Sequence, residues 1–86
     1  MSNKEREYEH DQIDSDRLLQ AAEAAMRAAE EVAEYTGGPR PYPADLMGGA
    51  LQPDYLAEFT KWEIERACEF LVRMGMLDAP SQEHRA

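Results

Sequence analysis

The chain has 86 residues, one cysteine and a formal net charge of −9 at pH 7, so it has room for one small domain without an internal disulfide. The acidic balance disfavours direct binding to nucleic acid or to anionic membranes, because contacts to phosphate need a basic face. Since no apolar run approaches the ~18 residues of a membrane span and no signal-peptide pattern opens the chain, we expect a soluble, cytoplasmic protein with no membrane partner and no direct nucleic-acid partner.

Polar segments flank the part of the chain that can fold. Residues 1–13 are acidic and nearly free of apolar side chains, which predicts a flexible arm. Residues 78–86 form a polar tail, in which Pro80 prevents a preceding helix from continuing. A single small helical domain is therefore expected over residues 14–77.

Residues 15–36 give the strongest helix signal, because they are rich in Ala, Glu, Arg, Leu and Met. Asp14, Ser15 or Asp16 can cap the start, and Gly37 is placed for the left-handed residue that ends a helix. Apolar residues recur at alternating spacings of four and three, with Leu19, Met26 and Ala33 widening the stripe. The stripe consists of Leu18, Ala22, Ala25, Ala29 and Val32.

The central stripe positions Ala22, Ala25 and Ala29 are all alanine. Such small side chains let two helices approach closely but bury little apolar area per residue. This helix is therefore expected to need a close neighbour that supplies larger side chains. On its outer face, Glu23 and Arg27 are spaced for an i,i+4 ion pair.

Residues 37–59 are rich in proline and glycine and cannot form one regular helix. We expect an ordered connection with one or two short helical turns, after Pro43 and after Pro53. Two interpretations stay open: the segment covers the two helices as a lid, or it presents a stiff aromatic recognition surface. The apolar residues of this segment are Tyr42, Leu46, Met47, Leu51, Tyr55 and Leu56.

A second helix is predicted over residues 60–75. Thr60 and Glu63 have the spacing of a capping box, and Gly75 can end the helix in a Schellman motif that turns Met76 back onto it. Trp62 and Phe70 lie beside the main apolar stripe and make the helix apolar over more than half of its circumference. This helix is therefore expected to be contacted on more than one side.

No catalytic, metal or cofactor motif is found in the sequence. His10 and His84 lie in the polar ends without a Cys or His at ligand spacing, and the glycine pairs lack the lysine of a phosphate loop. Glu63 is the nearest candidate for a catalytic acid, but helix capping explains it. Cys68 falls on an apolar helix face, as a small buried side chain would. We therefore expect a protein that is not an enzyme and that has no cofactor or metal.

The fold class that these patterns predict is all-α, with a helical dimer as the expected state because the core of a single chain is small. The predicted function is protein–protein interaction: self-association, and binding or regulation of another protein. The alternative is a phage-derived inhibitor that mimics nucleic acid, of the anti-restriction or anti-CRISPR type; a DNA-binding regulator lacks the basic face that it needs. The residues predicted to carry the interaction are Ala22, Ala25, Ala29, Tyr42, Leu46, Met47, Tyr55, Trp62 and Phe70.

Overall fold

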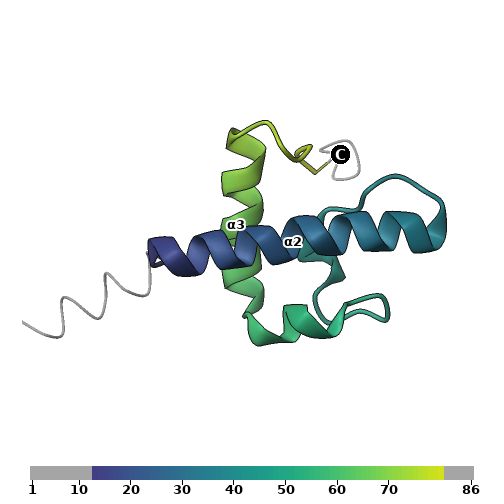
Figure 1. Ribbon diagram of the computed structural model, residues 1–86, viewed down its shortest axis with the longest axis horizontal. Helices are drawn as coiled ribbons and strands as arrows, with labels where there is room; N and C mark the ends of the chain where they lie inside the picture. The colour runs from purple at the N-terminus through teal and green to yellow at the C-terminus, as the bar shows by residue number, and fades with distance from the viewer. Residues whose placement is uncertain (1–12, 81–86) are drawn as a thin grey trace, which may run out of the picture.

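The computed structural model describes residues 13–80, and this part of the chain is mainly helical and contains no strand. Two α-helices, α2 (Ser15–Thr36) and α3 (Lys61–Arg73), are joined by a connection that holds two short 3-10 helices, η1 (Pro43–Leu46) and η2 (Asp54–Glu58). Figure 1 shows α3 crossing α2, with the connection doubling back toward the crossing. The all-α prediction is confirmed. The predicted arm, apart from residue 13, and residues 81–86 of the predicted tail lie outside the described residues.

Both ends of α2 are fixed by the residues that the sequence indicates. The Asp14 carboxylate accepts hydrogen bonds from the backbone N–H groups of Asp16, at 3.1 Å, and Arg17, at 3.4 Å. At the other end, Gly37 has a φ of 75° and donates its N–H to the carbonyl of Ala33 at 2.8 Å. The predicted bounds of 15–36 are confirmed.

The second helix begins with the predicted capping box. The Thr60 hydroxyl accepts from the backbone N–H of Glu63 at 3.0 Å, and the Glu63 carboxylate accepts from the N–H of Thr60 at 2.9 Å. At its end, Met76 donates its N–H to the carbonyl of Leu71 at 2.9 Å, as in a Schellman motif. The helix stops at Arg73 rather than at residue 75, because Gly75 takes a left-handed φ of 77°.

The alanine face of α2 forms its side of the core. Ala21, Ala25 and Ala28 are fully buried, and the helix packs against α3, η1 and η2. The stripe widens toward Ala21 and Ala28 and not toward Leu19, which remains 52% exposed. The close neighbour that the alanines require is thus present within the chain. The buried side chains of α3 are Ile64, Ala67, Cys68 and Leu71.

The proline-rich connection covers the two helices, as the lid interpretation predicts. The helix η1 contacts both α2 and α3, and η2 contacts α2. Leu46 and Leu56 are buried, and the aromatic and methionine side chains of the segment pack against the core while partly exposed. Leu51 departs from the prediction, since it is 44% exposed. The connection therefore supplies a third layer of the core.

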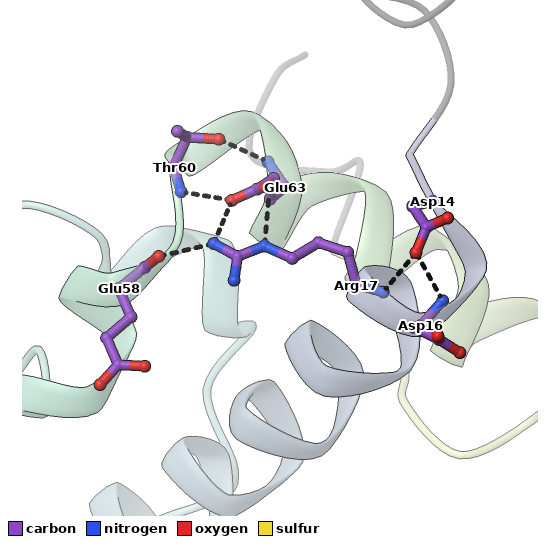
Figure 2. A network of polar contacts seen from close by, with 6 residues as sticks. All are labelled: Asp14, Asp16, Arg17, Glu58, Thr60 and Glu63. Carbon is purple, nitrogen blue, oxygen red and sulfur yellow. Dashed lines mark hydrogen bonds and ion pairs between the residues drawn. The ribbon is translucent and has the colours of Figure 1, made fainter.

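A polar network joins the first turns of the two α-helices (Figure 2). The guanidinium of Arg17 donates to both carboxylate oxygens of Glu63, from Nε at 3.0 Å and from Nη2 at 3.1 Å, and also to the carbonyl of Glu58 at 2.6 Å. This bidentate pair is a charge-assisted contact, and the hydrogen bond from Arg17 lowers the pKa of Glu63. Glu63 is therefore a structural carboxylate, held ionised between a cap and an arginine.

A second polar contact holds η2 on α2. The hydroxyl of Tyr55 donates to the Glu31 carboxylate at 2.7 Å, and the guanidinium carbon of Arg27 lies 4.6 Å from the centre of the Tyr55 ring. Burial, together with the hydrogen bond to Glu31, raises the pKa of Tyr55 to about 12. The short helix is thus fixed to the outer face of α2 as well as to the core.

Candidate functional site

An apolar groove of about 450 Å³ runs along the edge where α2 meets the C-terminal part of α3. We call it the methionine groove, because three of the side chains that line it are methionines. Its volume lies within the range of small binding pockets, and it is open to solvent. The groove is lined by Leu19, Ala22, Glu23, Met26, Arg27, Glu30, Phe70, Leu71, Met74 and Met76.

Large apolar side chains are exposed along the groove. Leu19 is 52% exposed, Met74 60% and Met76 50%. Met26 and Phe70 are partly buried and pack against the core, so they connect the groove to the interior. A scattered exposed leucine is ordinary on a protein surface, whereas several large apolar side chains around one concavity are typical of an interaction site.

Two local features of the sequence build this groove. Leu19 and Met26 are seven residues apart in α2, and this spacing places them two turns apart on the same side of the helix. At the other wall, α3 ends at Arg73 and the left-handed Gly75 reverses the chain between Met74 and Met76. The Schellman turn therefore directs both methionines into one concavity.

The charged side chains of the groove are Glu23, Arg27 and Glu30. Arg27 pairs with Glu31 at 3.0 Å and not with Glu23, so the predicted Glu23–Arg27 ion pair is wrong. The Glu31 carboxylate also accepts a hydrogen bond from Tyr55, so it holds both Arg27 and Tyr55. Within residues 13–80, neither Glu23 nor Glu30 forms an ion pair. The groove charges without an ion-pair partner among the described residues are therefore negative.

Two of the residues predicted to carry the interaction line the groove. Ala22 is 5% exposed, at the base, and Phe70 is partly buried in the wall. Ala25 and Ala29 are fully buried within the chain. As the chain stands, these two alanines are not accessible to a partner.

The other predicted residues lie away from the groove. Leu46 is buried in the core, whereas Trp62 is 36% exposed on α3, where the guanidinium carbon of Arg66 lies 6.0 Å from its ring centre. Tyr42, Met47 and Tyr55 belong to the partly buried lid. The structure therefore does not bring the predicted residues together on one surface.

Sequence reasoning missed the four most characteristic residues of the groove. Two signals were available: large side chains adjoin the alanine stripe of the first helix, and the Met-Gly-Met sequence follows the second. The exposure of these side chains depends on which edge of the stripe the second helix covers. The missed residues are Leu19, Met26, Met74 and Met76.

A second hollow, of about 790 Å³, lies between the connection and the outer side of α3. Both signs of charge line it, from the basic residues Arg40 and Lys61 and the acidic residues Asp45, Glu65, Glu69 and Asp78. Within residues 13–80 no three His, Cys, Asp or Glu side chains are grouped to hold a metal ion. The hollow therefore presents a mixed charged surface.

The thiol of Cys68 is enclosed in the core, where burial raises its pKa to about 11. None of the helices in the described residues is both long and apolar enough to cross a bilayer. No protein-family model, no curated protein and no solved structure matches the chain. The geometry of the methionine groove is therefore the basis on which a function can be proposed.

Proposed function

We propose that the protein is a non-enzymatic interaction protein that binds another protein through the methionine groove. The observation that carries this proposal is the contrast within α2. Four of its alanines are fully buried, while Leu19 on the same helix is 52% exposed beside Met74 and Met76. The four alanines are Ala21, Ala25, Ala28 and Ala29. Full burial of a leucine or methionine side chain stabilises a complex by roughly 1.5–3 kcal/mol. Because Leu19, Met74 and Met76 are already about half buried, a partner that covers the groove would gain roughly half of this free energy at each of them.

The chemistry of the groove suits recognition of protein surfaces. Methionine is unbranched and has a polarisable sulfur, so it adapts its shape to different apolar partners. Phe70 adds a large flat surface, and aromatic residues are enriched at interfaces. The fully buried, unreactive Cys68 accords with a reducing, cytoplasmic location.

Self-association is a more specific form of the same proposal. Because Ala25 and Ala29 are buried within the chain, the alanine stripe is closed to a second copy, and we propose the methionine groove as the dimer interface instead. Two grooves related by twofold symmetry would place apolar walls against each other. The dimer and a complex with a different protein thus compete for one surface.

Mimicry of nucleic acid has less support. It would need a regular track of free carboxylates, and on α2 the Glu31 carboxylate is engaged by Arg27 and Tyr55. Arg27 also lies between Glu23 and Glu30 in the sequence of this helix. The glutamates of this face therefore do not form an uninterrupted acidic surface.

The test compares the wild-type chain with one groove variant and one control. Leu19→Gln with Met74→Gln removes apolar side chains from the groove without changing net charge, and Leu51→Gln removes an exposed leucine elsewhere. Each chain is immobilised and exposed to a lysate of the cells that make it. We expect one cellular protein to bind the wild type and Leu51→Gln but not the groove variant. Equal retention by all three proteins would contradict the proposal.

A further inference from the structure

We infer that the natural occupant of the methionine groove is an amphipathic helix of another protein, with basic residues flanking its apolar face. This inference rests on the proposed function and adds the chemistry of the partner. It is carried by the combination of apolar walls with two glutamates, Glu23 and Glu30, that lie on the α2 side of the same groove and form no ion pair within residues 13–80.

Charge complementarity selects a basic partner. Among residues 13–80, Arg27 is the one cation that lines the groove, and it already pairs with Glu31 at 3.0 Å and lies over the ring of Tyr55. Glu23 and Glu30 have no such partner within residues 13–80, and the whole chain has a net charge of −9. Lysine or arginine on an incoming chain would supply the missing partners and speed association.

The same charges argue against a second copy as the occupant. Twofold pairing through the groove would bring Glu23 and Glu30 of both chains to one interface, while each Arg27 remains engaged within its own chain. Juxtaposed like charges cost several kcal/mol and act against wrong partners. The apolar walls alone would favour a dimer, but the charges that accompany them favour a different, basic protein.

The spacing of the glutamates fits a helical partner. Glu23 and Glu30 are seven residues apart, and two helical turns separate them by about 10.5 Å along α2. A partner helix lying alongside α2 would match this distance with basic residues at i and i+7. Its apolar face would enter the groove through i, i+3, i+4 and i+7 anchors, as in other helix-in-groove complexes.

The experiment uses the full chain and three labelled peptides in fluorescence anisotropy. The peptides are helices of about 18 residues, or five turns, with identical leucine faces and with lysine, glutamine or glutamate at the flanking positions. We expect the lysine peptide to bind most tightly and its affinity to fall as salt is added. The glutamate peptide is expected to bind most weakly.

Two pairs of variants locate the binding. Leu19→Gln with Met74→Gln should abolish binding of the lysine peptide, whereas Leu51→Gln should leave it unchanged. Glu23→Gln with Glu30→Gln should weaken it about three-fold to ten-fold, the sum expected of two exposed ion pairs. Asp45→Asn with Glu65→Gln, which makes the same charge change in the second hollow, should have no effect beyond a small uniform decrease.

The outcomes separate this inference from the function on which it rests. Equal binding of all three peptides, still lost in the groove variant, would overturn the basic partner and leave the groove as an interaction site. A dimer in sedimentation that dissociates on Leu19→Gln with Met74→Gln would replace the basic helix by a second copy. Failure of every peptide to bind a monomeric wild-type chain would contradict both the groove and its occupant.

Discussion

The two sides of α2 carry apolar side chains of different size and exposure. The side that faces the core buries alanines, with Ala21, Ala25 and Ala28 fully enclosed. The edge that faces the groove carries larger side chains, and Leu19 there is 52% exposed. Burial of apolar area alone would favour the reverse arrangement, since a leucine gains more than an alanine from leaving water.

Under the proposed function, this difference separates folding from binding. Small side chains allow α3 and the connection to approach α2 closely, so that a short chain closes a core with few large residues. The free energy left unrealised at Leu19, Met74 and Met76 is available to a partner. Substitutions on the two sides are therefore expected to have opposite consequences, large for stability on one and large for binding on the other.

The largest loss of stability is expected from Leu56→Ala. Leu56 is fully buried and is among the largest enclosed side chains, and truncation of a buried leucine costs about 2–5 kcal/mol. Urea denaturation followed by circular dichroism measures the change. A loss below about 1 kcal/mol would show that the connection does not complete the core.

Enlarging the alanine side gives the next effect. Ala25→Leu should destabilise the fold by about 1–3 kcal/mol, because three added carbons cannot fit a closed interface. The same substitution at the exposed Ala57 should change the free energy of unfolding by less than about 0.5 kcal/mol. Equal melting temperatures for Ala25→Leu and Ala57→Leu would indicate that the alanine side is loosely packed.

The Tyr55 contact predicts a pH dependence. Because its pKa is raised to about 12 in the folded chain, compared with about 10 when unfolded, Tyr55 contributes stability that is complete below pH ~10. That stability is lost as pH rises through about 12. In urea denaturation at a series of pH values, Tyr55→Phe should flatten the decline of the free energy of unfolding over this interval. Tyr35→Phe, at an 81% exposed position, should not. Parallel curves of the free energy of unfolding against pH for the wild type and both variants would contradict the contact between Tyr55 and Glu31.

The smallest change in stability is expected at the groove. Leu19→Gln and Met74→Gln should each alter the free energy of unfolding by no more than about 0.5 kcal/mol, since both side chains are more than half exposed. Thermal melting and urea denaturation measure this. A loss of 2 kcal/mol or more (roughly the value of a buried side chain) would place these residues in the core and remove the contrast between the two sides.

Local signals in the sequence predicted the helices well. Asp14, Gly37, Thr60 and Gly75 determine the ends of α2 and α3 through contacts within a few residues, and such contacts can be recognised from spacing alone. The buried leucines of the connection followed from the need of two short helices for a third layer. These predictions required no knowledge of how the helices cross.

The groove could not be predicted in the same way. Leu19 and Ala21 lie on either side of one stripe, and only the position of α3 and η1 decides that Ala21 is buried and Leu19 is not. The pairing of Arg27 with Glu31 likewise depends on Tyr55, which is 24 residues beyond Glu31. Long-range packing therefore determines both the apolar walls of the groove and its unpaired charges.

The most direct test of the central claim is a titration of methionine methyl groups in the wild-type chain with the lysine peptide, followed by NMR. Met26, Met74 and Met76 line the groove, whereas Met47 belongs to the lid and serves as an internal control. The account predicts that the three groove methyl signals shift together and saturate while that of Met47 stays in place. Shifts at Met47 without changes at the groove methionines would contradict it.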